Sequence, residues 1–177
     1  MVNLIIKVIS IVVLMLPPTF LEAEASDQTY TIGFGSCITE KREQPIWKAI
    51  KEENIDEFFF MGDNVYGDSD DGLLIEMKES YKKQKNMFPD WVFSKKLNAI
   101  WDDHDYGKND GGFEYPLKQE AQAMFLEFWN VAKDDPRHLR EGIYFSEEKE
   151  IFGKTINLIA LDTRYHRSFL DQADKPY

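Results

Sequence analysis

A small set of residues in this chain carries side chains that bind metals or move protons. Cys37 is the only cysteine, so it cannot form a disulfide within the chain. Asp63 and Tyr66 stand three residues apart, so both can approach one ion from a single loop. Asp103 and His104 follow in a second acidic and aromatic segment. Thiolate, carboxylate, phenolate and imidazole groups are all metal ligands, and the combination predicts a metallohydrolase.

The types of these ligands indicate which metals to expect. Carboxylates favour hard cations such as calcium, whereas a thiolate favours softer or more covalent metals. A phenolate is a good ligand for ferric iron, as in haem enzymes that use tyrosine. Cys37, Asp63 and Tyr66 together therefore indicate iron rather than zinc, and Asp103 with Asp63 could hold calcium nearby. A structural zinc site is disfavoured, because it would need four cysteine or histidine ligands.

The elements that must position these residues alternate along the chain. We expect strands over residues 30–34, 57–61, 97–101, 143–145 and 155–161, and helices over 44–53, 73–85 and 117–132. Four of the strands end in polar, reactive residues, namely Cys37, Asp63, Asp102 with Asp103, and Asp162. Open α/β sheets bind ligands at the carboxyl ends of their strands, so these strand ends are expected to converge on one metal site.

The first 25 residues have the layout of a cleavable signal peptide. Lys7 precedes an apolar run over residues 8–16, a Pro-Pro pair breaks the run, and Ala23 and Ala25 supply small residues near a cleavage point. The run is too short to span a bilayer comfortably, although an uncleaved membrane anchor is the alternative. We therefore expect a secreted or periplasmic protein without a membrane span, whose mature part, residues 26–177, forms one domain.

The acidic balance limits the partners of this protein. The formal net charge is −11 at pH 7. Such a surface repels nucleic acid and anionic membranes, so a nucleic-acid-binding surface is not expected. A phosphate ester would be repelled as well, unless bound cations reverse the local potential.

Four segments resemble the alkaline phosphatase D (PhoD-like) metallophosphatases. They are residues 34–37 (FGSC), 60–68 (FMGDNVYGD), 101–110 (WDDHDYGKND) and 159–165 (IALDTRY), and they occur in the same order as in that family. The resemblance runs from about residue 30 to the last residue. It implies a layered αββα metallophosphatase fold, and a phosphomonoesterase or phosphodiesterase outside the cytoplasm that uses Fe3+ and Ca2+.

The resemblance also implies roles for individual residues. Cys37, Asp63 and Tyr66 would bind the ferric ion, with Asp63 bridging to calcium. Asp103 would occupy the position where related metallophosphatases use an asparagine ligand, and His104 would assist the leaving group. The expected mechanism is attack on phosphorus by a metal-bound hydroxide.

Two further assignments keep alternatives. His104 could donate a proton to the leaving alkoxide, or it could be a structural histidine held between carboxylates. Arg164 could bind a phosphate oxygen through its planar guanidinium, or it could form an ion pair with Asp162 or another neighbour.

The sequence departs from the family pattern after residue 165. Family members continue with a second sheet and further ligands in a Gly-Asp-x-His-like motif, and none of His104, His138 and His166 lies in such a motif. We therefore expect the first sheet and its helices but not the second sheet, with apolar residues in 58–60 and 158–161 exposed. The chain would be a truncated form or would be completed by a partner. The alternative is a non-catalytic, secreted remnant that binds metal or phosphate.

Overall fold

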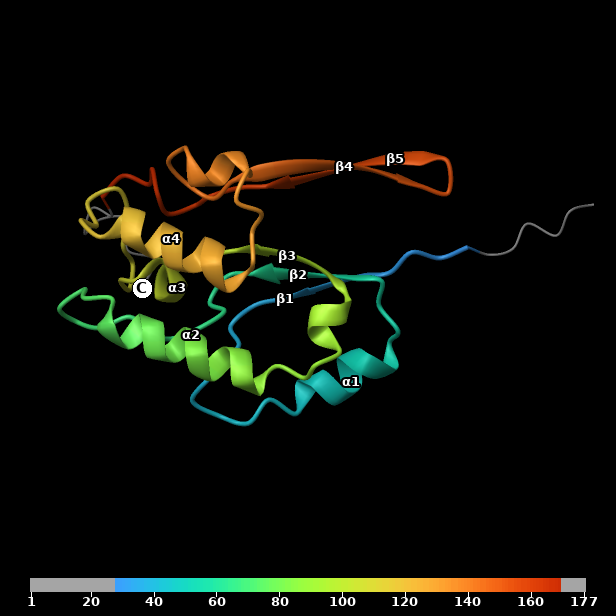
Figure 1. Cartoon of the computed structure of the whole chain (residues 1–177), viewed down its shortest axis with the longest axis horizontal. Coiled ribbons are helices and arrows are strands. Elements are labelled where there is room, and N and C mark those ends of the chain that lie inside the picture. The colour runs from blue at the N-terminus through green and yellow to red at the C-terminus, as the bar shows by residue number, and fades with distance from the viewer. Residues whose placement is uncertain (1–27, 170–177) are drawn as a thin grey trace, which may run out of the picture.

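The computed structural model describes residues 28–169, which fold as a mixed α/β structure (Figure 1). The predicted signal peptide over residues 1–25 lies outside the described residues. Within residues 28–169, no helix is both long enough and apolar enough to cross a membrane.

The main sheet consists of three parallel strands in the order β1-β2-β3, as the α/β prediction requires. The strands are β1 (Ile32–Gly35), β2 (Glu57–Met61) and β3 (Lys96–Ile100). Gly35 pairs with Phe60 and Met61 pairs with Ile100, so the carboxyl ends of the strands lie at one edge. The predicted strand positions are confirmed to within about two residues.

Helices cover one face of this sheet. They are α1 (Ile46–Glu52), α2 (Ile75–Met87), the short α3 (Asp103–Tyr106) and α4 (Lys118–Phe128), with 3-10 turns η1 (Val92–Ser94) and η2 (Pro136–His138). The helix predicted over 117–132 ends early, because Trp129 closes it and Asn130 takes a positive φ of 51°.

An aromatic core fixes the helices on the sheet. Phe58 and Phe60 of β2 point to the helix side, where the Trp47 ring of α1 lies 5.8 and 6.0 Å from theirs. Phe88 and Trp129 pack on Phe60 at 5.5 and 4.5 Å. Burying each large aromatic side chain contributes about 2–3 kcal/mol, so this cluster is a main source of stability. The expectation that residues 58–60 are exposed is wrong, since all three are buried.

A two-stranded antiparallel sheet covers the opposite face (Figure 1). It is a hairpin of β4 (Phe145–Ile151) and β5 (Lys154–Ala160). The strand predicted over 143–145 is therefore wrong, and so is the expectation of a single sheet. The prediction of exposed apolar residues is confirmed at Ile159 and Leu161, which are 70% and 64% exposed.

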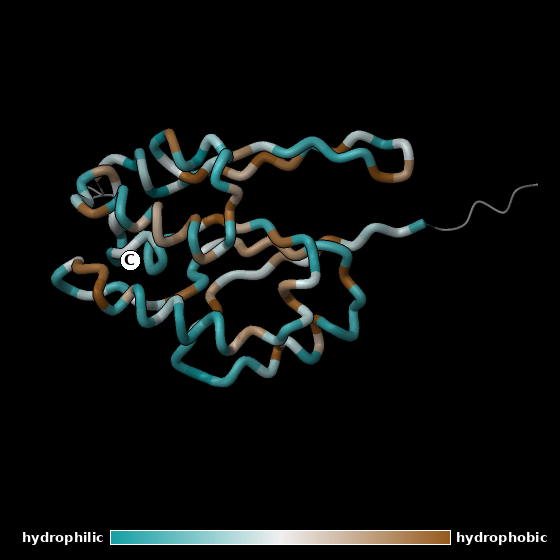
Figure 2. Tube along the Cα trace, in the orientation of Figure 1, coloured by the Kyte–Doolittle hydropathy of each residue, from teal (hydrophilic) through white to brown (hydrophobic). Residues whose placement is uncertain are grey.

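Several contacts join the hairpin to the main sheet, and they include an ion pair between Lys96 and Glu147 and a hydrogen bond from Asn98 Nδ2 to Glu147 at 3.3 Å. The Phe145 ring stacks on the Phe59 ring at a centroid distance of 6.3 Å. The Lys149 ammonium donates to the fully buried carboxylate of Glu57, which also accepts from Asn98 Nδ2 at 2.5 Å. Figure 2 shows that much of the hairpin is hydrophilic, so polar contacts add to the Phe59–Phe145 stack in joining the two sheets.

Candidate metal centre

The candidate site lies at the carboxyl edge of the main sheet. Cys37 follows β1, Asp63 follows β2, and Asp103 opens α3 directly after β3. Three of the four predicted strand ends therefore meet, as expected for ligands at the carboxyl edge of parallel strands. The fourth, Asp162, follows β5 in the separate hairpin and has a different role.

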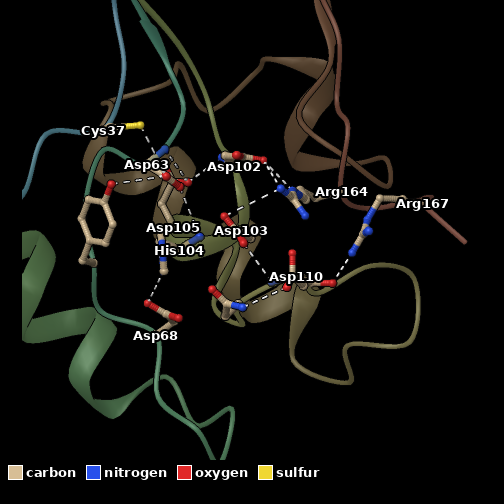
Figure 3. Close-up of polar contacts among 12 residues, drawn as sticks. Cys37, Asp63, Asp68, Asp102, Asp103, His104, Asp105, Asp110, Arg164 and Arg167 are labelled. Carbon is tan, nitrogen blue, oxygen red and sulfur yellow. Dashed lines mark hydrogen bonds and ion pairs between the residues drawn. The ribbon is translucent and has the colours of Figure 1, made fainter. Parts of the chain in front are cut away.

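Asp63 is at the centre of the site (Figure 3). Its Oδ2 accepts from the Cys37 thiol at 3.6 Å and from the Tyr66 hydroxyl at 3.4 Å, and its Oδ1 accepts from the backbone N–H of His104 at 3.4 Å. Asp63 is 8% exposed, while Cys37 is exposed. The thiol, phenol and carboxylate expected to share one ion therefore do lie around one oxygen atom.

Asp103 and His104 complete a compact group with Asp63. Each of these three residues offers one ligand atom, and the three atoms lie within 4.8 Å of one another. Burial and the nearby Asp103 carboxylate raise the pKa of Asp63. Burial also opposes ionisation of Asp103, but the N–H of Asp110 and the Arg164 guanidinium hold its pKa below the usual range. Two close, buried carboxylates repel each other, and a cation between them would remove that cost.

The backbone at the site has a special conformation. Cys37 and Asp63 take positive φ angles of 59° and 52°, which are uncommon for residues with a side chain. Their loops are tied together, because Cys37 N donates to Gly62 O at 3.1 Å and Ile38 N donates to Asp63 O at 3.0 Å. Gly62 has a φ of 101°, and a Cβ there would lie 2.7 Å from the backbone N of Asp102. Only glycine lets the ends of β2 and β3 approach this closely.

His104 is held by Asp68, which sequence reasoning did not single out. His104 Nδ1 lies 2.8 Å from Asp68 Oδ1, and the Tyr66 ring lies 4.4 Å from the imidazole ring. Burial tends to lower the pKa of His104, but the hydrogen bond and charge of Asp68, with further carboxylates nearby, raise it overall. The imidazole is therefore oriented by a carboxylate, and Nε2 is the ring nitrogen left for chemistry.

Asp105 holds together the loops that carry the site, and it was not identified as a site residue from the sequence. This fully buried carboxylate accepts from the backbone N–H groups of Asp63, Asn64 and Asp102 at 3.3, 3.1 and 2.6 Å. It also accepts from Asn64 Nδ2 at 2.5 Å. Burial raises the pKa of Asp105 to about 8, and the N–H donors oppose that rise. Its place at the third position of α3, typical of a helix-start carboxylate, is the signal that could have revealed it.

Asp162 is a structural residue, and its role is to place Arg164. Its Oδ1 accepts from Trp101 Nε1 and from the backbone N–H groups of Arg164 and Tyr165, each at 2.9 Å. Its Oδ2 accepts from Ile143 N at 2.8 Å. The expectation that Asp162 contributes a strand end to the metal site is therefore wrong.

Arg164 reaches the edge of the candidate site from this turn. Its guanidinium Nη2 lies 2.5 Å from Asp102 Oδ1 and 3.7 Å from Asp103 Oδ1. The alternative of an ion pair with a neighbour is thus confirmed, with Asp102 rather than Asp162 as the partner.

We compared the chain with protein-family models, curated proteins and solved structures, and none of them matched.

Proposed function

We propose that this chain is a metal-dependent phosphoric ester hydrolase with the αββα architecture of the PhoD-like metallophosphatases. The observation that carries the proposal is the group of Asp63, Asp103 and His104, in which two carboxylates that could hold metal and one imidazole each bring a polar atom within 4.8 Å of the others at the carboxyl edge of a parallel sheet. Helices on one face of this sheet and the hairpin on the other are compatible with such an architecture.

The donor set fits two kinds of cation. The Cys37 thiol and the Tyr66 hydroxyl both contact Asp63 Oδ2, so these three groups would hold ferric iron. Asp63 and Asp103 are carboxylates of the kind that hold calcium. Cations there supply Lewis acidity and neutralise charge on the phosphoryl group of the substrate. They would also overcome the repulsion between an acidic protein and an anionic substrate.

The other residues act on the substrate directly. The Arg164 guanidinium binds a phosphoryl oxygen of the substrate and orients it. His104 holds a proton at Nε2 and gives it to the oxygen of the leaving alcohol. Asp68 stabilises the protonated ring through Nδ1, and the raised pKa of His104 keeps a larger share of it protonated near neutral pH.

A second candidate function is a non-catalytic domain that binds metal or phosphate. The observation in its favour is that Asp102 already occupies the guanidinium of Arg164.

A measurement of catalytic turnover distinguishes the enzyme from the non-catalytic domain. The chain is loaded with Fe3+ and Ca2+ and assayed with an aryl phosphate and a diaryl phosphate. We expect hydrolysis that Asp63→Asn and His104→Gln abolish or reduce at least about a hundredfold.

The matched control is Asp134→Asn, the same chemical change at an exposed position away from the site, which should retain activity. Metal binding without turnover in any variant would favour the non-catalytic domain. Turnover that survives Asp63→Asn would contradict the proposed site.

We also propose that the chain is exported, to the periplasm or the medium. The support is the charged start, the apolar run and the small residues within 1–25. The exported product should begin at Ser26, and N-terminal sequencing that finds Met1 or Val2 in a soluble extracellular form would refute this.

A further inference from the structure

Asp102 makes an unusual contact with Arg164 beside the metal site (Figure 3). Nε and Nη2 of the guanidinium both reach the same oxygen, Asp102 Oδ1, at 2.5 Å. A carboxylate that saturates an arginine presents both oxygens, one to each nitrogen. Here one oxygen serves two donors, as a single phosphoryl oxygen could.

The pair is exposed enough to be exchanged. The side chain of Asp102 is 41% exposed, while that of Arg164 is 14% exposed. Solvent screens such a pair, and ion pairs of this kind contribute little to stability. An incoming anion can therefore compete with Asp102 for the guanidinium.

The fold does not depend on this pair to hold Arg164 in place. The backbone of Arg164 is fixed by Asp162, which is itself held by Trp101 Nε1 and Ile143 N. On the other side, Phe113 N donates to Arg167 O at 2.9 Å. If the ion pair with Asp102 breaks, the guanidinium of Arg164 remains beside Asp103.

We propose that Asp102 is a built-in competitor of the substrate for Arg164. An anionic phosphoryl oxygen replaces Asp102 Oδ1 on the guanidinium, and the freed carboxylate turns to water. Asp102 thereby sets the affinity of the site for phosphoryl anions. This inference rests on the proposed function only for the identity of the anion.

The competition has a measurable size. The apparent affinity for the anion is reduced by the fraction of Arg164 that Asp102 occupies. For a partly exposed ion pair, removal of the competitor should tighten anion binding by roughly two- to fivefold. Loss of the arginine should weaken it by about tenfold or more, because a charge-assisted hydrogen bond is lost.

The test is calorimetric titration of inorganic phosphate into the chain after calcium loading and removal of excess ions. Four proteins are compared: wild type, Asp102→Asn, Arg164→Gln and the double variant. Asp102→Asn should tighten phosphate binding in the wild-type background and change it little in the Arg164→Gln background. This dependence on Arg164 separates competition from a general change in charge.

Two controls protect the result. Asp110→Asn removes another negative charge near the site whose side chain does not contact Arg164, and it should tighten binding less than Asp102→Asn does. Asp102→Ser removes the charge but keeps a residue that can start α3, so it should reproduce the effect if Asp102→Asn disturbs folding.

Three outcomes overturn the inference: equal tightening in both backgrounds, no tightening by Asp102→Asn or Asp102→Ser, and no phosphate binding by any variant. The expected binding pattern without ester hydrolysis would instead leave the role of Asp102 intact and refute the proposed enzymatic function. With turnover, Asp102→Asn and Asp102→Ser should lower KM for the ester more than they change kcat.

Discussion

The buried ion pair between Lys149 and Glu57 should control the docking of the β4–β5 hairpin on the main sheet. The Glu57 side chain is fully buried and that of Lys149 is 8% exposed. Lys149→Met removes the ammonium and leaves a buried carboxylate with Asn98 and Tyr30 as its remaining donors. Breaking a buried pair in this way costs about 3–5 kcal/mol, and the two remaining donors favour the lower end, about 3 kcal/mol.

The double variant Glu57→Leu with Lys149→Met tests the ion pair more sharply than Lys149→Met alone, because it removes both charges. It leaves no unpaired charge, and replacing a buried pair by apolar residues is often close to neutral. We expect it to lose less than about 2 kcal/mol, so the two substitutions should be strongly non-additive.

Urea unfolding of the whole chain measures both values, and Lys154→Met serves as the control. Lys154 is exposed on the same hairpin, so its replacement should change the free energy of unfolding by less than about 0.5 kcal/mol. A loss below about 1 kcal/mol in Lys149→Met would refute the reasoning, as would a double variant that costs the sum of its single variants.

Three further outcomes follow from the structure. In the iron-loaded chain, Cys37→Ser should reduce iron content and weaken or shift the visible absorption from the Cys37 thiolate and Tyr66 phenolate; an unchanged spectrum and content would remove Cys37 from the ligand set. Gly62→Ala should destabilise the fold by at least about 1–2 kcal/mol and weaken metal binding, because φ is 101° and a Cβ would meet the end of β3; full stability and affinity would contradict this. Arg137 hydrogen-bonds Asp135 and lowers its pKa from 3.8 to about 2, so this pair stabilises the fold above about pH 4, and the contribution is lost as the pH falls through 2. Asp135→Asn should therefore cost about 1 kcal/mol at pH 6, after allowance for solvent screening, and the difference should shrink between pH 4 and 2; a difference independent of pH would refute the assignment.

The parts of the fold that the sequence predicted well are those with local signals. The apolar run that forms β2 ends in Gly62 and Asp63, and this pattern placed both the strand and the central ligand. Asp103 and Cys37 were placed in the same way, because residues after parallel strands meet at one edge of the sheet.

The parts that were missed depend on contacts distant in sequence. Strand β4 has the sequence FSEEKEI, whose charged residues disfavour a strand. It forms a strand by pairing with β5, and Lys149 links it to Glu57 of the main sheet, 92 positions away. Asp68 and Asp105 were overlooked because an aspartate that follows a strand most often caps or starts a turn or helix, and their partners His104 and Asn64 are distant from them in sequence.

The central claim is that Asp63 and Asp103 bind a metal ion. The most direct measurement is equilibrium metal content and affinity for iron and calcium, compared among wild type, Asp63→Asn, Asp103→Asn and the control Asp134→Asn. Wild type and Asp134→Asn should bind metal alike, and each of the two site variants should lose at least about tenfold in affinity for one of the ions. Wild type that binds neither iron nor calcium, or site variants that bind both as wild type does, would contradict the account.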